Sequence, residues 1–263
     1  MKVGLSTWSL LEQDVYSAVK RIGDAGSEYV ELWGEAPHAH PDLVDRRRLK
    51  DVLSAYVMVV TTHAPFTDLN LASPFQPVKG AVERTLEGFV KFSDFLGAKM
   101  VTFHPGSVHN AALVPQADAS AASSLRKMVE ASGGAMSVNI ENQSKSSSKY
   151  HYPVGSTLES LTRVLSLVPG SKCTLDVGHA HASGLDPSEC LGALGGRLAE
   201  VHVSDNAGSA DDHLIPGHGT VPLGRLMDEV RESDVLVCLE LNPHRYGPDQ
   251  ILDAFRKAKS GKL

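Results

Sequence analysis

The stretch 57-VMVVTTH-63 is a short apolar run that ends in a histidine, and 100-MVTFH-104 repeats this pattern farther along the chain. Between them, the segment 77-PVKGAVERTLEGFVKFSDFLG-97 has apolar residues at the three- and four-residue spacing of an amphipathic helix. Parallel strands need a long crossover connection, which is usually a helix. This unit therefore predicts an α/β fold with a parallel sheet.

The same unit recurs along the whole sequence. Strand-like runs are expected at 3–8, 29–33, 57–63, 100–104, 136–141, 173–177, 199–204 and 235–241. Helical patterns follow them within 14–26, 42–55, 77–97, 115–133, 157–168, 187–195, 222–233 and 248–259. Eight such units in 263 residues predict a single-domain (β/α)8 TIM barrel. The alternative is a doubly wound sheet, but 6-STWSLLEQ-13 lacks the glycine-rich phosphate fingerprint expected after the first strand of that fold.

The composition is typical of a soluble globular protein, with 42% hydrophobic and 21% charged residues. The formal net charge of −6 argues against tight non-specific binding to nucleic acid, which requires a basic face. The three cysteines are far apart, which predicts buried reduced thiols. Because the chain has neither a signal segment nor an apolar run long enough to span a bilayer, we expect a cytoplasmic protein with no membrane partner.

Six of the strand-like runs carry an acidic residue or a histidine at or near their end. These residues are His63, His104, Glu141, Asp176, His202 and Glu240. The carboxyl ends of the strands of a TIM barrel meet at one mouth, where the active sites of such enzymes lie. One such residue has little significance, but the whole set predicts a functional site at this mouth.

Carboxylate and imidazole donors without thiolates suit Zn²⁺, Mn²⁺, Co²⁺ or Fe²⁺. We therefore expect a divalent metal, zinc or manganese above all, and one to three ions because carboxylates can bridge. Further candidate donors stand in loops, namely His179 after the sixth run and Asp211 and His213 after the seventh. Asp211 and His213 are two residues apart, so an extended segment would place them on one side. The alternative for this loop is a polar, solvated lid.

The segment 143-QSKSSSKYHYPVG-155 interrupts the strand–helix alternation. It is rich in serine and lysine, which predicts a mobile, solvated loop. His218 lies in the Gly217–Gly219 corner and is expected to belong to the polar lid.

At these residues the sequence resembles the xylose-isomerase-like TIM-barrel superfamily, and the resemblance covers nearly the whole chain. That superfamily joins divalent-metal sugar isomerases and epimerases with the type IV AP endonucleases. Its shared metal core is a Glu, Asp, His, Glu set on strands five to eight. The resemblance places this core at Glu141 in 140-IEN-142, Asp176 in 175-LDVGHA-180, His202 in 201-VHVSDN-206 and Glu240 in 239-LELN-242. His181 has no counterpart in the pattern.

The segments 31-ELWG-34 and 211-DDHLIPGHGTVPL-223 are similar to the sugar phosphate isomerase and epimerase relatives. This resemblance implies a divalent-metal-dependent isomerase or epimerase whose partner is a small sugar or sugar phosphate. The catalytic residues would be Glu141 and Glu240, one removing a proton beside a metal-bound carbonyl and the other returning it.

Three further residues are expected to contact the substrate in such an enzyme: His179, Lys145 and Arg245. One narrower match fails. The free-ketose 3-epimerases have a Glu and an Arg where this chain has Ser147 and Gly208. The resemblance therefore implies the metal core but not the substrate pocket of a ketose epimerase.

The alternative function is that of a zinc-dependent type IV AP endonuclease, which hydrolyses phosphodiesters at abasic sites in DNA. Those enzymes resemble a three-zinc version of the site, and their nine ligands have counterparts at His63, His104, Glu141, Asp176, His179, His202, Asp211, His213 and Glu240. The segment 69-LNLASP-74 is also similar, whereas the acidic net charge is unfavourable for binding duplex phosphates. DNA is thus a partner only under this alternative. A non-catalytic barrel is a third hypothesis, and the sequence leaves a homo-oligomer open.

Overall fold

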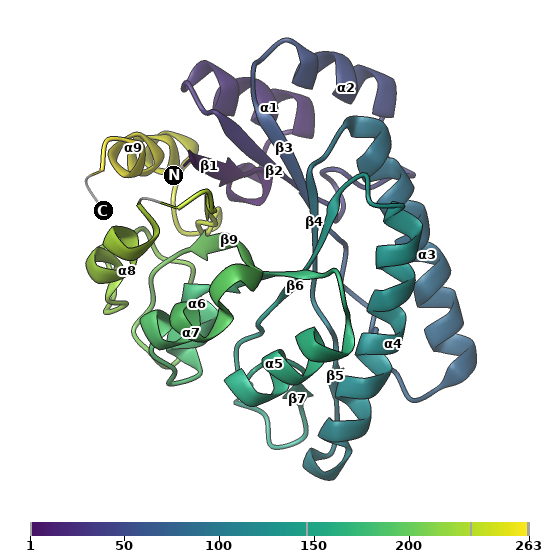
Figure 1. The fold of residues 1–263 in the computed structure, drawn as a ribbon. Coiled ribbons are helices and arrows are strands. Elements are labelled where there is room, and N and C mark those ends of the chain that lie inside the picture. The colour runs from purple at the N-terminus through teal and green to yellow at the C-terminus, as the bar shows by residue number, and fades with distance from the viewer. Residues whose placement is uncertain (1, 146, 232, 262–263) are drawn as a thin grey trace.

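The computed structural model describes residues 2–145, 147–231 and 233–261. Within them, eight parallel strands close into a barrel in the order β1-β10-β9-β8-β6-β4-β3-β2, and the helices lie around its outside (Figure 1). The first and last barrel strands pair directly, with Leu5 beside Leu239. This closure confirms the TIM barrel and excludes the doubly wound sheet, whose edges stay open.

The elements lie close to the positions expected from the sequence. The barrel strands are β1 (Lys2–Ser6), β2 (Tyr29–Trp33), β3 (Val59–His63), β4 (Met100–Phe103), β6 (Ser137–Glu141), β8 (Lys172–Asp176), β9 (Leu198–Val203) and β10 (Leu236–Leu239). The helices are α1 (Val15–Asp24), α2 (Arg46–Ser54), α3 (Gln76–Leu96), α4 (Val114–Ser132), α5 (Leu158–Leu167), α6 (Val177–Ala182), α7 (Pro187–Leu194), α8 (Leu223–Val230) and α9 (Pro248–Lys259). Short 3₁₀ helices occur at Thr7–Leu10, Ala111–Leu113 and Gly195–Arg197, and two further strands are β5 (Ser107–Val108) and β7 (Tyr152–Pro153).

The helices begin and end where the sequence provides capping residues. The carboxylate of Asp14 accepts hydrogen bonds of 3.1 Å from the backbone N–H groups of Tyr16 and Ser17, which fixes the first turn of α1. Prolines stand in the first turns of α3, α4, α7 and α9, where a missing N–H costs nothing. Gly97 and Gly133 end α3 and α4 with the left-handed backbone that glycine tolerates best.

The hydrophobic core lies between the strands and the surrounding helices, where Leu32 and Phe89 are fully buried. The inside of the barrel contains a polar layer. Thr102 and Thr174 donate hydrogen bonds of 2.9 and 3.0 Å to Oε2 of Glu200. Branched apolar side chains ordinarily fill this space in a TIM barrel. The buried polar layer therefore distinguishes this barrel and lies next to the candidate site.

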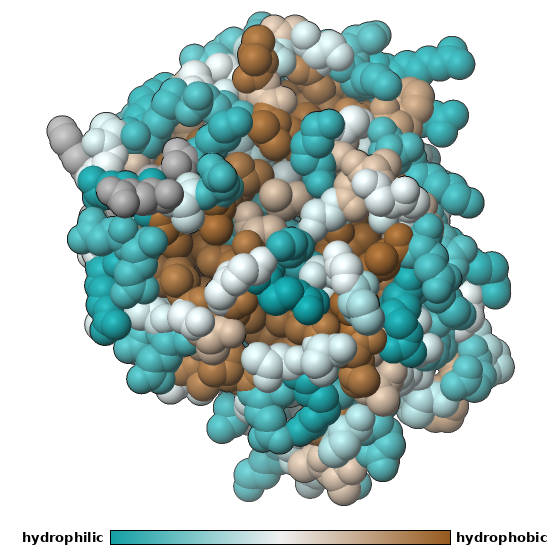
Figure 2. All heavy atoms as spheres, viewed as in Figure 1, coloured by the Kyte–Doolittle hydropathy of each residue, from teal (hydrophilic) through white to brown (hydrophobic). Residues whose placement is uncertain are grey.

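The surface has its own polarity pattern. Figure 2 shows hydrophilic side chains over the edge of one face and hydrophobic residues gathered toward its centre. Among the described helices, none is both long and apolar enough to cross a membrane.

The residues after Asp176 form the short helix α6, where the sequence predicted a loop. The side chain of Asp176 accepts a 2.6 Å hydrogen bond from the backbone N–H of His179, which is the geometry of a helix N-cap. This cap starts a helix directly at the end of β8. The prediction of a loop was therefore wrong, and His179 lies in the first turn of a helix.

The segment 143–155 was expected to be a mobile loop, and the structure shows that its two ends are held against neighbouring loops while residues 147–151 are exposed. Strand β7 near its end pairs antiparallel with β5. The side chain of Gln143 donates hydrogen bonds to the carbonyls of Gly106 at 2.7 Å and Val154 at 2.9 Å. A polar segment can be held in this way because its side chains form hydrogen bonds with the backbone carbonyls of neighbouring loops.

Candidate metal centre

A central group of four donors lies at the mouth of the barrel: Glu141, Asp176, His202 and Glu240. Glu141 and Asp176 end β6 and β8, His202 lies on β9, and Glu240 directly follows β10. One ligand atom from each lies within 4.8 Å of the others, and all four residues are buried. Nδ1 of His202 is 3.3 Å from Oε1 of Glu141 and 3.5 Å from Oε2 of Glu240.

This central group has buried polar atoms without hydrogen-bond partners among the residues that the structure describes. They are Oε1 of Glu141, Oδ2 of Asp176, both ring nitrogens of His202 and Oε1 of Glu240. Such atoms are rare and costly unless something satisfies them. Three carboxylates and one imidazole are the donors that divalent ions such as Zn²⁺ and Mn²⁺ accept. The residues present therefore fit a divalent ion.

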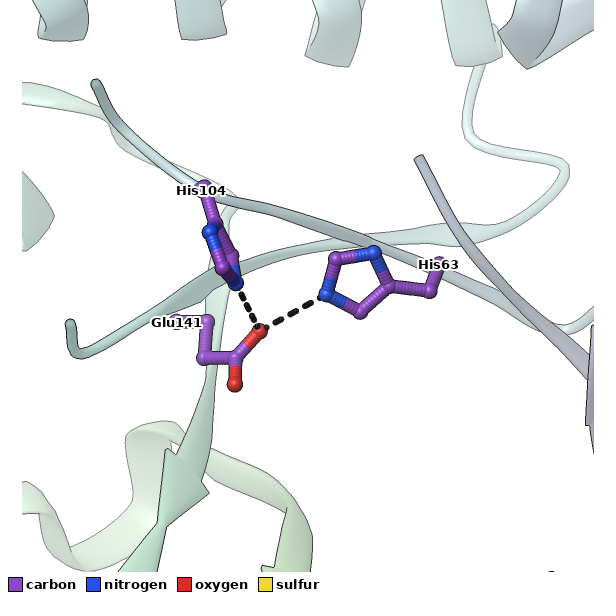
Figure 3. A group of neighbouring side chains, drawn as sticks. All are labelled: His63, His104 and Glu141. Carbon is purple, nitrogen blue, oxygen red and sulfur yellow. Dashed lines mark hydrogen bonds and ion pairs between the residues drawn. The ribbon is translucent and has the colours of Figure 1, made fainter. Parts of the chain in front are cut away.

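A first flanking group consists of His63, His104 and Glu141 (Figure 3). Nε2 of His63 and Nε2 of His104 lie 3.0 and 3.1 Å from the same oxygen, Oε2 of Glu141. The ring of Phe66 stacks on His104, with the ring centroids 4.2 Å apart. Glu141 thus faces the flanking histidines with one oxygen and the central group with the other.

A second flanking group consists of His179, Asp211 and His213. Oδ2 of Asp211 is 3.0 Å from Nε2 of His179 and 3.2 Å from Nε2 of His213. The side chains of His179 and His213 are 7% and 14% exposed and that of Asp211 is 26% exposed, so the group lies at the edge of the solvent and the lid alternative for Asp211 and His213 stays open.

Three of these histidines have the same orientation. Nδ1 of His63 lies 2.9 Å from the carbonyl of Ala64, Nδ1 of His179 lies 2.8 Å from that of Asn142, and Nδ1 of His213 lies 3.0 Å from the carbonyl of residue 240. A carbonyl can only accept, so Nδ1 carries the proton in each ring. Nε2 is left facing the carboxylate of its group. Metal-binding histidines in proteins are commonly held in this way.

Opposite charges compensate for burial in the central group. Burial favours the neutral form of Glu141, but the nearby His104 and His202 lower its pKa well below its ordinary value. Burial disfavours protonation of His202, yet Glu240, Glu31 and Glu141 raise its pKa well above the ordinary value. Asp176 has weaker compensation, so burial raises its pKa to about 6. Side chains with strongly shifted pKa values often cluster at functional sites.

The loop that carries Asp211 and His213 is anchored by Asp205. The buried carboxylate of Asp205 accepts hydrogen bonds of 2.8–3.0 Å from the backbone N–H groups of Asn206, Gly217, Gly219 and Val221. A Cβ atom at position 219 would lie 2.4 Å from Oδ1 of Asp205, so only glycine fits there. This anchor explains how a loop can hold two donors in place.

Sequence reasoning missed two buried acids inside the barrel, Glu31 and Glu200, which form a further group with His202. Oε2 of Glu31 is 3.1 Å from Nε2 of His202, and burial raises the pKa of Glu31 to about 7. One signal was available in the sequence. Glu200 is two residues before His202 on one strand, so their side chains point to the same face.

A pocket of about 560 Å³ opens above these groups. Its walls include the aromatic rings of Trp8, Trp33 and Phe66, and its polar lining includes Asn70, Gln143, Ser144, His151, His179, Asp211, His213 and Glu240. Among the described residues that line it, none is a lysine or an arginine. Lys145 and Arg245 are exposed outside it.

A family model described as a xylose isomerase-like TIM barrel matches residues 19–260. The chain belongs to this xylose isomerase-like family.

Relatives in the family are distant but match over nearly their full length. Fructoselysine 3-epimerase of Escherichia coli O157:H7 is 23% identical over 274 residues, covering 97% of this chain and 98% of that protein. An uncharacterized protein of Mycobacterium leprae is 28% identical over 255 residues, covering 89% and 85%. The solved structure of a D-tagatose 3-epimerase-like protein has a TM-score of 0.83 at 22% identity, covering 100% and 99%. That likeness supports the fold.

In this member of the xylose isomerase-like family, the nine donors expected from the sequence fall into the central and two flanking groups. His181 lies outside the groups and contacts Thr220 at 2.9 Å, and Nδ1 of His218 lies 3.1 Å from the hydroxyl of Tyr246. The two expected cationic contacts, Lys145 and Arg245, do not reach the pocket lining.

Proposed function

We propose that this chain is a divalent-metal-dependent isomerase or epimerase of a small, unphosphorylated sugar. One observation carries the proposal: a central group of buried, partly unsatisfied carboxylates and imidazole lies beneath an aromatic pocket that Glu240 itself lines. Such a pocket holds a small molecule, and the donors beneath it can act on one polar end of that molecule.

Glu141, Asp176, His202 and Glu240 would hold the ion. When bound, a divalent ion supplies Lewis acidity that polarises a substrate carbonyl and acidifies the neighbouring C–H. Oε1 of Glu240 has no hydrogen-bond partner in the described part of the chain and the residue lines the pocket, so this carboxylate can accept a proton from substrate. Oε1 of Glu141 lies 3.3 Å from Nδ1 of His202, and in its protonated form Glu141 would return a proton to the substrate.

The pocket lining favours a neutral substrate. A phosphate group would call for a lysine or arginine, and the described lining has neither. The rings of Trp8 and Trp33, with centroids 6.0 Å apart, offer apolar faces against which a sugar ring can pack. Ser147 is exposed and Gly208 has no side chain, so contacts of the free-ketose type are not available from these two positions.

The relatives support this proposal. One of the proteins compared above is named fructoselysine 3-epimerase, and the solved structure that shares the fold is named D-tagatose 3-epimerase-like. Epimerisation at a carbon next to a carbonyl proceeds by loss and return of a proton, which is the chemistry that two carboxylates beside one metal would perform.

Deuterium exchange tests the proposal. Mn²⁺-loaded protein is incubated in D₂O with free ketoses, 3-keto-glucosides and fructoselysine, beside matching phosphate esters, and deuterium incorporation is followed by NMR. We expect exchange at the carbon beside the carbonyl of a free sugar and much slower exchange with its phosphate ester. Cleavage of abasic-site DNA without exchange in any sugar would contradict the proposal.

A second candidate function is zinc-dependent hydrolysis of phosphodiesters at abasic sites in DNA. The observation that favours it is the presence of both flanking groups, each with three donors within 4.8 Å. The net charge of −6 and the pocket without described cations weigh against a DNA substrate. Metal stoichiometry separates the two functions, because the isomerase needs one ion in the central group and the endonuclease reading needs three.

A further inference from the structure

His202 differs from the other histidines of the site in the nitrogen that faces the donor cluster. His63, His179 and His213 direct Nε2 to a carboxylate, while Nδ1 meets a backbone carbonyl. In His202 the nitrogens are reversed, so that Nδ1 faces the central group and Nε2 faces Glu31. A side chain therefore stands where the other rings have a carbonyl.

The contact between Glu31 and His202 joins two atoms that lack an aligned hydrogen bond to any described residue. Oε2 of Glu31 and Nε2 of His202 are 3.1 Å apart, and both side chains are fully buried. Within the described part of the chain, neither atom makes an aligned hydrogen bond. Because a buried donor and a buried acceptor each need a partner, this pairing is the one that satisfies both.

Glu200 is the other carboxylate near that ring nitrogen, at 3.6 Å. Its two oxygens already accept hydrogen bonds from the hydroxyl groups of Tyr29, Thr102 and Thr174. Oε1 of Glu31 accepts from the Cys238 thiol at 3.8 Å, but Oε2 has no hydrogen-bond donor among the described residues, so it has the acceptor capacity that Glu200 lacks.

We propose that Glu31 is a positioning residue that accepts the Nε2–H of His202 and leaves the lone pair of Nδ1 to the central group. This inference rests on the proposed function, because it assumes that the central group binds a divalent ion. A neutral imidazole carries a single proton, and a ring that binds metal through Nδ1 must carry it on Nε2. A carboxylate in this place fixes the ring orientation and increases its basicity as a ligand.

The test compares Glu31→Leu and Glu31→Gln with the control Thr61→Val. The control removes a buried hydroxyl from the same barrel interior, where Thr61 donates to the hydroxyl of Tyr29 at 3.2 Å. Mn²⁺ alone is titrated into each metal-free protein by calorimetry. We expect binding about 10–100-fold weaker in Glu31→Leu, as for other partners of metal-binding histidines. Glu31→Gln should recover most of the affinity because its amide oxygen can accept, and Thr61→Val should match the wild type.

A spectroscopic readout accompanies the titration. In Zn²⁺-loaded wild type we expect the Nε2–H proton of His202 to be observable by NMR and protected from solvent exchange, and in Glu31→Leu we expect that protection to be lost. If Glu31→Leu binds Mn²⁺ as tightly as the wild type, or if Thr61→Val loses as much affinity as Glu31→Leu, the inference is overturned but the proposed function is not. Wild-type protein that binds neither Mn²⁺ nor Zn²⁺ would refute the proposed function and the inference with it.

Discussion

Oδ2 of Asp211 lies 3.0 Å from Nε2 of His179, although Asp211 belongs to a loop and His179 to the first turn of α6. From the sequence, His179 was the residue whose role differed between the two functions. In the structure its two nitrogens meet the Asn142 carbonyl and the Asp211 carboxylate, so its ring is fixed. Under either function, the role of His179 therefore depends on its contact with Asp211, and a substitution of Asp211 tests that role.

Asp211→Asn keeps the shape of the side chain and removes its charge. Under the proposed function we expect Mn²⁺ stoichiometry to stay at one per chain while kcat/KM falls about tenfold or more, since a hydrogen bond to a charged group contributes ~1.5–3 kcal/mol. Elemental analysis and steady-state kinetics check this. If the variant instead loses one of several bound zinc ions, the result would support the alternative endonuclease function.

Glu240→Gln should greatly slow proton transfer while leaving the fold intact. Glu240 lines the pocket and has an unpartnered carboxylate oxygen, which the amide cannot replace as a base. We expect deuterium exchange to fall by about 100-fold or more, the usual contribution of a positioned base. The matched control is Glu83→Gln, a buried acid on α3 that pairs with Lys79 and Lys127, away from the site. Equal exchange rates in Glu240→Gln and wild type would show that Glu240 is not the base.

The aromatic rings of Trp8, Trp33 and Phe66 form one wall of the pocket, and this aromatic wall predicts that removing a ring weakens substrate binding. The ring of Trp8 packs against those of Trp33 and His213, with centroids 6.0 and 4.7 Å away. Trp8→Ala should raise KM about 5–15-fold, in line with ~1–1.5 kcal/mol for a ring contact, and Trp8→Phe should recover much of it. An unchanged KM in Trp8→Ala would mean that substrate does not touch this wall.

Glu83 predicts a pH-dependent part of the stability. Burial opposes its charge, but Lys127 and Ser124 lower its pKa below the ordinary value of 4.5. A depressed folded-state pKa means that the contribution is present above the unfolded pKa and is lost as pH falls through the folded pKa. The difference in unfolding free energy between wild type and Glu83→Gln should therefore be larger at about pH 7 than at about pH 3. A difference independent of pH in urea titrations would contradict this.

The barrel and most donors could be predicted because they depend on local patterns. Apolar runs alternating with amphipathic segments indicated the strands and helices, and the barrel topology then placed residues such as His63 and Glu240 around one pocket. Helix α6 was missed because its six residues are too few to show a helical period. Glu31 was missed because an acid inside an apolar strand becomes interpretable only when its partner, His202, is known.

Glu141 presents Oε2 to His63 and His104, and Oε1 to His202. Two groups of donors therefore share one carboxylate, and we expect a ligand bound at one group to change the affinity of the other. Thermodynamic linkage requires this effect to be reciprocal. Substitutions in the two groups should consequently be non-additive in a double-mutant cycle, so that His63→Ala and Glu240→Gln together differ from the sum of their separate effects.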